Sequence, residues 1–322
     1  MSLSLGRIAY KLVFEPLGRV KRSLREGGPI EQRRDRVGHE AMREAASALP
    51  ALREPPGGGL RQIHFLSGPK YWHQTLFCFV SLQLRLPFCV TPLIYDDGRM
   101  DEPTREALRR VVPWMRFVDE AETAARLDAL LPEARYPALH ARRRVYPHLR
   151  KLTDIHIGSK EFRLVADSDM LFFGIPDELA TWFARPDWFY MQDAFTAYGY
   201  PTDYLANLAG APVPEPVNVG LYAVDGTVID WDRVEHWCAR QIADHGPRYL
   251  QEQALTAMLF AGREAIVLPR ERYVVRPNHS EGNNPTAVLH HYVDISKRSY
   301  FRSGWRQVSA LAQTRAQSGS VS

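Results

Sequence analysis

The middle of this 322-residue chain alternates between short apolar runs and stretches whose apolar residues recur at helical spacing. The apolar runs predict strands at 62–66, 88–95, 116–118 and 162–166. The amphipathic stretches between them predict helices at 72–84, 104–112, 120–131 and 138–155. Strands and helices in this alternating order predict an α/β domain with a Rossmann-like, mostly parallel central sheet flanked by helices.

The second half of the chain has a more mixed pattern. Strands are expected at 187–191 and 217–224, helices at 231–244 and 251–260, and a last ordered run at 289–292. The segment 196–216 is polar, aromatic and rich in Gly and Pro, which predicts a long loop. The chain looks frayed from Gln313 onward, and residues 306–322 are expected to form a flexible C-terminal tail.

The N-terminal residues 1–58 differ in character from the main domain expected at 59–305. Residues 1–37 hold nine Lys or Arg and four acidic residues. Apolar residues recur there at helical spacing, at Leu5, Ile8, Leu12 and Val13. The pattern predicts a basic helical arm that ends in the Pro/Gly linker 55–59. Two interpretations stay open: a solvated helix packed on the main domain, or peripheral contact with an anionic membrane surface.

Composition excludes several broad classes of protein. The net charge is +4 (41 Lys and Arg minus 37 Asp and Glu), and 45% of residues are hydrophobic, so neither global disorder nor a polytopic membrane protein fits. A charge so near balance does not suit a protein whose main partner is nucleic acid. Three cysteines without a C-x-x-C pair indicate a reducing compartment. Arg7 and Lys11 interrupt the apolar core of a signal peptide, so we expect a cytoplasmic protein, either free or at the inner face of the membrane.

Three of the predicted strands end in small or acidic residues. Ser67-Gly68 follows the first strand, Asp96-Asp97-Gly98 the second, and Asp167-Ser168-Asp169 the strand at 162–166. Ligands of parallel sheets bind beyond the carboxyl ends of the strands, so we expect these residues to form a ligand site at one edge of the sheet. The run Asp96-Asp97-Gly98 is equally compatible with a simple turn, because Asp-Gly is a strong turn dipeptide.

The strongest chemical signal is the aspartate pair Asp167 and Asp169. Side chains alternate along a strand, so both carboxylates are expected to point the same way and Ser168 the opposite way. Two carboxylates this close repel each other unless a cation lies between them. Oxygen ligands suit Mg²⁺ or Mn²⁺, which keep open positions for phosphate oxygens. The alternative is a turn or helix cap with two exposed acids.

Three elements in order along the chain resemble the GT-A glycosyltransferases, in particular the family-eight type that includes glycogenin and bacterial lipopolysaccharide galactosyltransferases. They are residues 163–170 followed by Pro176, similar to the family's strand, D-S-D, apolar, P signature; Val217-Asn218-Val219-Gly220-Leu221, similar to its F-N-S-G strand; and His291 to Lys297, similar to its H-F-x-G-x-x-K element. The resemblance implies a GT-A fold and a nucleotide-sugar transferase domain at 59–305. Asp294 stands where the family has Gly, and residues 251–256 (Q-E-Q-A-L-T) stand where it has D-Q-D-x-L-N.

The resemblance also implies a metal site and its neighbours. Asp167, Asp169 and His291 would bind Mn²⁺ or Mg²⁺ against the diphosphate of a sugar nucleotide, with the adjacent His290 as an alternative ligand. Lys297 would hold the same phosphates, and Asn218 would hydrogen-bond the donor sugar.

Six further residues are candidates around this site. Ser67 and Gly68 stand where the family's first strand meets the nucleoside, and Asp97 resembles an acid that contacts the base or ribose in other GT-A enzymes. Lys151 ends a basic segment that can lie over the nucleotide phosphates. Asp193 and Glu252 are candidates for sugar or acceptor contact and for the catalytic group.

The function implied by the resemblance is metal-dependent transfer of a hexose from a nucleotide-diphosphate sugar to a glycan, lipid-linked or other acceptor, as in polysaccharide biosynthesis. UDP is the expected nucleotide, and no nucleic-acid partner is expected. Two alternatives stay open: a haloacid-dehalogenase-like phosphohydrolase, and a non-catalytic sugar-nucleotide-binding protein. The phosphohydrolases normally carry Thr or Val two residues after the second Asp, where this chain has Leu171. The donor sugar, the acceptor and the choice between retention and inversion are left open.

Overall fold

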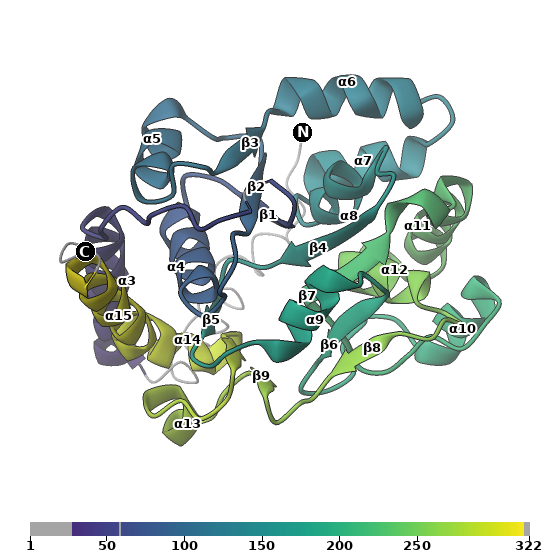
Figure 1. The fold of residues 1–322 in the computed structure, drawn as a ribbon. Helices are drawn as coiled ribbons and strands as arrows, with labels where there is room; N and C mark the ends of the chain where they lie inside the picture. Colours follow the sequence, from purple (N-terminus) through teal and green to yellow (C-terminus); the bar gives the residue numbers. More distant parts are fainter. Residues whose placement is uncertain (1–27, 58, 319–322) are drawn as a thin grey trace, which may run out of the picture.

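The computed structural model describes residues 28–57 and 59–318, and these form a central sheet with helices on both faces (Figure 1). The sheet has seven strands in the order β3-β2-β1-β4-β7-β6-β8. Their bounds are β1 Gln62–Ser67, β2 Thr91–Asp96, β3 Arg116–Val118, β4 Phe162–Ala166, β6 Phe189–Gln192, β7 Val217–Asp225 and β8 Ile266–Leu268. Only β7 runs antiparallel to its neighbours. The expected mostly parallel α/β fold is therefore confirmed.

A second, smaller sheet adjoins the end of β4. It contains β5 Met170–Phe172, β10 Leu289–His291 and β9 Tyr273–Val275 in the order β5-β10-β9. β10 pairs antiparallel with β5, and His291 is opposite Met170. This pairing brings the end of the chain beside the Asp167–Asp169 segment, which links β4 to β5.

The helices divide into two sets that cover opposite faces of the central sheet. Their bounds are α3 Gly28–Ser47, α4 Trp72–Gln83, α5 Glu102–Val111, α6 Glu120–Leu130, α7 Pro137–Val145, α8 Leu149–His156, α9 Asp177–Ala184, α10 Thr202–Ala209, α11 Trp231–His245, α12 Gln251–Leu259, α13 His279–Asn283, α14 Lys297–Ser299 and α15 Trp305–Ser318. Two 3₁₀ turns, η2 Gly226–Val228 and η3 Asp294–Ser296, and one π-helical turn, η4 Tyr300–Gly304, complete the described helices. β4 shows the division, because Leu164 and Ala166 pack in one core and Val165 in the other. None of the described helices is long and apolar enough to span a membrane.

The structure corrects two expectations about helices. The single helix expected at 138–155 is two helices, α7 and α8, because Pro147 disfavours helical backbone in the residue before it. The loop expected at 196–216 contains helix α10, which ends at Gly210 in the left-handed conformation.

The flexible tail expected at 306–322 is contradicted as far as Ser318. Helix α15 begins at Trp305 and buries Trp305, Val308 and Ala312, which share one helical face. The Trp305 ring lies 5.8 Å from that of Phe77 in α4. The apolar spacing anchors this helix to the core, and residues 319–322 lie outside the described part.

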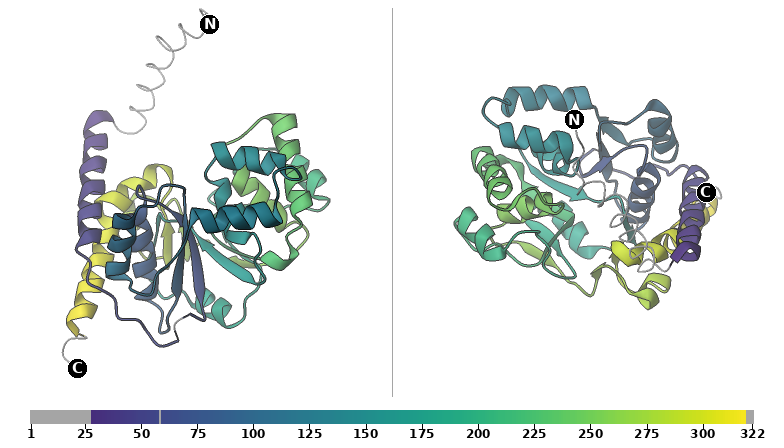
Figure 2. Two further views of the ribbon diagram at one scale, coloured as in Figure 1. Left: turned by 90° about the horizontal axis from the view of Figure 1, so that it is seen from above. Right: turned by 180° about the vertical axis from the view of Figure 1, so that it is seen from behind.

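The N-terminal arm is described only from Gly28, and the expected basic helix over the preceding residues lies outside the described part. Helix α3 lies alongside α15 at one side of the molecule (Figure 2). Its Met42 and Ala46 are fully buried in the same core as α4. Residues 28–47 are therefore packed on the main domain.

Candidate active site

The carboxyl ends of β1, β2 and β4 lie at one edge of the central sheet, as expected from their polar ends. The three strands are parallel neighbours in the order β2-β1-β4. The two acids that follow β2 differ in their surroundings. Asp96 Oδ1 accepts hydrogen bonds from the N–H groups of Gly98, Arg99 and Met100 at 2.7–2.9 Å. Asp96 therefore closes the turn, in agreement with the turn interpretation.

Asp97 lies against the end of β1 instead. A Cβ atom on Gly68 would lie 2.2 Å from Asp97 Oδ1, so only glycine permits this approach. Burial raises the pKa of Asp97, and the charge of Asp96 raises it further. Its buried Oδ1 has no hydrogen-bond partner among the described residues. An unsatisfied buried acceptor beside a sheet edge is available to a ligand donor.

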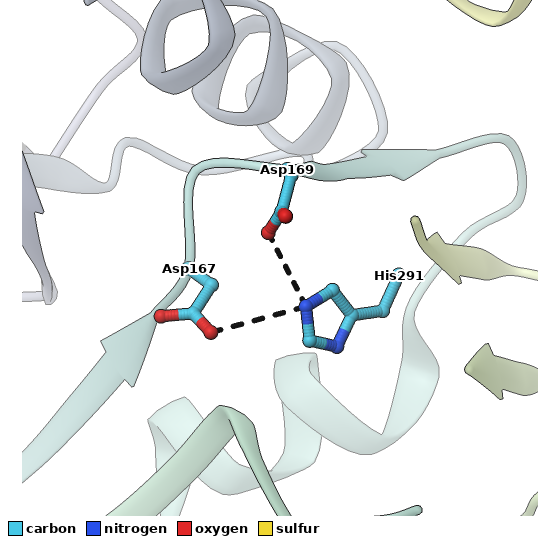
Figure 3. Close-up of side chains that lie close together, drawn as sticks. All are labelled: Asp167, Asp169 and His291. Carbon is cyan, nitrogen blue, oxygen red and sulfur yellow. Dashed lines mark ion pairs between the residues drawn. The ribbon is translucent and has the colours of Figure 1, made fainter. Parts of the chain in front are cut away.

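The two aspartates of the D-S-D motif converge with His291 (Figure 3). Nε2 of His291 lies 3.2 Å from Asp169 Oδ1 and 3.8 Å from Asp167 Oδ2. One ligand atom from each of the three residues lies within 4.8 Å of the others. Strand alternation does not explain why the two carboxylates point the same way, because β4 ends at Ala166 and the D-S-D motif is an irregular link between β4 and β5. Hydrogen bonds hold this link: Asp167 N–H donates to Gly220 O, and Asp169 O accepts from Tyr292 N–H.

The pairing of β10 decides between the two adjacent histidines. His291 faces the aspartates, whereas His290 is fully buried on the other side of the strand. His290 Nε2 lies 2.8 Å from Glu281 Oε1, and its Nδ1 lies 3.0 Å from the Tyr292 hydroxyl. His290 is therefore held in a separate hydrogen-bond group away from the aspartates.

The donor set of this cluster fits a divalent cation. Nδ1 of His291 lies 3.0 Å from Asn218 Oδ1, so Nε2 is the nitrogen that faces both carboxylates. The atoms that face one another, two carboxylate oxygens and the imidazole lone pair, are all acceptors, so a proton or a cation between them is favoured. Burial would lower the pKa of His291, but the hydrogen bond and charge of Asp169 and the charge of Asp167 outweigh it and raise the pKa. Carboxylate and imidazole donors are compatible with Mn²⁺.

Two lysines flank the cluster on opposite sides. Lys297 Nζ lies 3.1 Å from Asp169 Oδ2, and its side chain is 42% exposed. Lys151 Nζ is buried, 2.9 Å from Asp167 Oδ1 and 3.6 Å from Glu252 Oε2. Burial favours the neutral amine of Lys151, but Asp167 and Glu252 raise its pKa to about 12. Lys151 is thus a fixed internal cation, whereas Lys297 is open to a ligand.

Glu252 is a buried carboxyl group poised to titrate near neutral pH. It lies in the first turn of α12, where Thr256 Oγ1 donates to its Oε1 at 3.3 Å. Burial raises the pKa of Glu252 to about 7, with the Lys151 charge opposing and the Asp167 charge adding to the rise. A carboxyl group with such a pKa can hold or release a proton under physiological conditions.

Asp193 follows β6 and is held by Gln253, the residue after Glu252 in α12. Gln253 Nε2 donates to Asp193 Oδ2 and to Val217 O, both at 3.1 Å. Arg270 donates to the Asp193 backbone oxygen. Sequence reasoning gave Gln253 and Arg270 no role, because their partners are distant in sequence and no local spacing connects them.

Ser67 and Asp294 carry local structure next to the cluster. The Ser67 hydroxyl lies 2.7 Å from Thr75 Oγ1, which in turn lies 2.7 Å from Ser168 Oγ, so this chain ties β1 and α4 to the D-S-D link. Asp294 has φ +49°. This is the left-handed region that favours glycine and that Asp tolerates better than most residues. Asp294, which stands where the family has Gly, therefore adopts a backbone conformation that Gly would also allow.

The sequence did not predict two aromatic rings near the cluster, those of His148 and Tyr249. The His148 and Tyr249 rings lie 5.3 Å apart, and Tyr249 is 72% exposed. The charges of Lys151, Asp167 and Asp169 all act on the pKa of His148, which burial lowers. Single aromatic residues in turns have no spacing signal, so only the fold could reveal them.

Comparisons with known proteins bear on the fold. No protein-family model matches the chain, and a search of curated proteins finds no match. Similar solved structures include the galactosyltransferase LgtC in complex with donor and acceptor sugar analogues, with 15% identity, 79% of this chain and 95% of that chain covered, and a TM-score of 0.51. Mouse xyloside xylosyltransferase 1 has 13% identity, 72% and 96% coverage, and a TM-score of 0.49. The LgtC match confirms the GT-A type fold expected from the sequence.

Proposed function

We propose that this protein is a metal-dependent glycosyltransferase that moves a sugar from a nucleotide-diphosphate donor, with UDP as the nucleotide, to a glycan or lipid-linked acceptor. The observation that carries the proposal is the convergence of Asp167, Asp169 and His291 at the carboxyl edge of parallel strands. The fold shared with the galactosyltransferase LgtC supports it. Ligands of such sheets bind beyond this edge.

Each residue of the cluster has a part in holding the donor. Asp167, Asp169 and His291 would hold Mn²⁺ or Mg²⁺, which when bound stabilises negative charge on the departing diphosphate. Lys297, half-exposed beside Asp169, donates to the same phosphate oxygens as a compact positive charge. Asp97 accepts from the ribose or base at the end of β2, next to Ser67 and Gly68.

Two carboxyl groups are available on the sugar side of the proposed site. Asp193 is fixed by Gln253, and Glu252 is buried beside Lys151. With a pKa of about 7, Glu252 can donate a hydrogen bond when protonated or stabilise positive charge on the sugar when ionised. We assign Glu252 and Asp193 as the catalytic candidates.

The proposal is tested by UDP binding and sugar transfer in the presence and absence of Mn²⁺. A screen of nucleotide sugars by thermal shift identifies the donor, because a bound ligand raises the apparent stability. Asp169→Ala is expected to abolish cation-dependent UDP binding and transfer, and Asp232→Ala, an exposed acid in α11, serves as the control. Unchanged cation-dependent UDP binding in Asp169→Ala would contradict the proposal.

The same assays separate the two alternatives. A haloacid-dehalogenase-like phosphohydrolase would hydrolyse simple phosphate esters with Asp167 as nucleophile, yet Asp167 is already paired with Lys151 at 2.9 Å. A non-catalytic binding protein would bind UDP without hydrolysing or transferring the sugar. The ionisable pair of Glu252 and Lys151 at 3.6 Å favours chemistry over binding alone.

We also propose peripheral contact with an anionic membrane through the outer face of α3. Arg33, Arg34 and Arg36 are exposed there, and the apolar Ile30 and Val37 are 70% and 56% exposed. Exposed basic side chains attract anionic lipid headgroups, and exposed apolar side chains beside them can enter the interface. Flotation with phosphatidylglycerol vesicles is expected to capture the protein, and charge reversal of the three arginines is expected to release it. Equal capture by neutral vesicles would contradict the proposed contact with anionic lipid.

A further inference from the structure

Three consecutive residues of β7 contact the groups of the candidate site. Gly220 O accepts a hydrogen bond from Asp167 N–H at 2.7 Å. Val219 O accepts from Lys151 Nζ at 3.0 Å. Asn218 Oδ1 accepts from Gly220 N–H at 2.8 Å and lies 3.0 Å from Nδ1 of His291. This one antiparallel strand thus touches two of the three proposed metal ligands.

The direction of these hydrogen bonds is fixed by the backbone. A backbone N–H can only donate, so the Asn218 atom that faces Gly220 is the carbonyl oxygen and not the amide nitrogen. The same oxygen faces Nδ1 of His291. The acceptor at Nδ1 favours a proton on that nitrogen. Nε2, the nitrogen that faces Asp167 and Asp169, can then offer its lone pair to a cation that lies between them.

Gly220 also provides the space for the imidazole ring. A Cβ atom at this position would lie 2.4 Å from Cε1 and 2.5 Å from Nδ1 of His291, and 2.7 Å from Asn218 Oδ1. Contacts this short do not occur, so any side chain would displace the ring or the amide. Glycine within a strand often marks such a close approach.

We propose that Asn218 is a positioning residue for His291, which it holds in the tautomer that binds a divalent cation through Nε2. Gly220 donates the hydrogen bond that orients the Asn218 amide and leaves room for the ring. This inference rests on the proposed metal-dependent function and gives Asn218 a role separate from the sugar contact implied by the resemblance. Loss of such a partner of a metal-bound histidine typically costs about 10- to 100-fold in metal affinity.

A matched pair of variants tests the role in the full chain. Asn218→Leu has a similar volume but no acceptor, and it is expected to weaken Mn²⁺ binding, measured by EPR of free Mn²⁺, by about 10- to 100-fold. Asn218→Asp keeps the acceptor and is expected to retain Mn²⁺ binding. Gly220→Ala should weaken binding as well, whereas Gly226→Ala, whose Cβ would lie 2.3 Å from Ser159 Cβ, should affect stability alone.

Long-range ¹H–¹⁵N NMR reads the Nδ1 proton of His291, with and without Mg²⁺ as a diamagnetic cation. The wild type is expected to carry a proton on Nδ1 that is hydrogen-bonded to Asn218, and Asn218→Leu is expected to lose that hydrogen bond. An Nδ1 without a proton in the Mg²⁺-bound wild type, or equal Mn²⁺ affinity of Asn218→Leu and wild type, would overturn the inference. A wild type that binds neither cation would overturn the proposed metal dependence instead, and the Nδ1 hydrogen bond in the metal-free protein would still show whether Asn218 positions the ring.

Discussion

Two groups of charged side chains in this protein differ in their balance of hydrogen-bond donors and acceptors. Arg143 and Asp154 form a closed pair, with two hydrogen bonds of 2.7 Å between the guanidinium and the carboxylate and a third from Thr153 to Asp154. The cluster of Asp167, Asp169 and His291 instead brings three acceptors together. The aspartates of the cluster are also more exposed, at 30% and 19% against 2% for Asp154, so a ligand can reach them.

We expect this difference to separate a group that stabilises the fold from a group that binds a ligand. A closed pair needs no further partner, and removal of one member leaves the other charge uncompensated. In the cluster, Lys151 and Lys297 bind the outer carboxylate oxygens, whereas the inner oxygens and His291 Nε2 face one another. A change in the cluster is therefore expected to alter cation affinity. The predictions below test whether the two groups separate in this way.

The largest effect is expected when the closed pair is broken. Asp154→Ala leaves Arg143, whose side chain is 13% exposed, without its partner and is expected to cost about 3–5 kcal/mol in the free energy of unfolding. Urea unfolding measures this cost, and Mn²⁺-dependent UDP affinity should stay at the wild-type value. Arg144→Ala, on the helix that carries Arg143, is the control, because its pair with Glu133 is exposed and is expected to contribute about 1 kcal/mol or less. A loss of UDP affinity with no loss of stability in Asp154→Ala would erase the distinction.

A pH-dependent effect on stability is expected for Glu252. Its pKa is raised from 4.5 to about 7, so the folded state binds more protons than the unfolded state between these values. Stability therefore falls as the pH rises through this range. Glu252→Gln removes the dependence, and its stability relative to wild type should increase by at most about 3 kcal/mol from pH 4.5 to pH 7. Urea unfolding of both proteins at both pH values measures this change. A stability difference between Glu252→Gln and wild type that is the same at both pH values would contradict the raised pKa of Glu252.

A smaller effect, on binding alone, is expected for Lys297. The charge of Asp169 raises the pKa of Lys297, so the amine stays protonated, and it is half-exposed at the site. Lys297→Gln is expected to weaken UDP binding about tenfold or more, the size of a lost hydrogen bond to a charged group. Isothermal titration measures this change, and Lys297→Arg should retain most of the affinity. Unaltered affinity in the Gln variant would remove Lys297 from the phosphate site.

The smallest effect is expected at Asp294, which belongs to neither group. Its φ of +49° is strained for a residue with a side chain, and its pair with Arg276 is 4.0 Å long and exposed. Asp294→Gly is expected to raise the free energy of unfolding by about 1 kcal/mol or less, because relief of strain is partly offset by the greater freedom of glycine in the unfolded chain. A clear loss of stability would show that the exposed ion pair matters more than the backbone.

Much of the fold and part of the site could be predicted from local patterns. Apolar runs and helical spacing identified most strands and helices, since burial on one face requires those periods. The polar ends of β1, β2 and β4 predicted their common edge. The D-S-D motif predicted the aspartate pair, although the alternation argument assumed a strand where the chain is irregular. The end of the chain was misjudged, because its polar composition outweighed the apolar face of α15.

Sequence by itself determined which chemical groups this protein has and their local spacing: two aspartates two residues apart, adjacent histidines six and seven residues before a lysine, and an Asn followed closely by Gly. Tertiary structure alone decided which of them meet. The choice of His291 over His290 follows from the pairing of β10 with β5, and the hydrogen bond from His291 to Asn218 depends on the packing of β7. Spacing along a chain fixes which side chains share a face, but only long-range packing fixes what that face contacts.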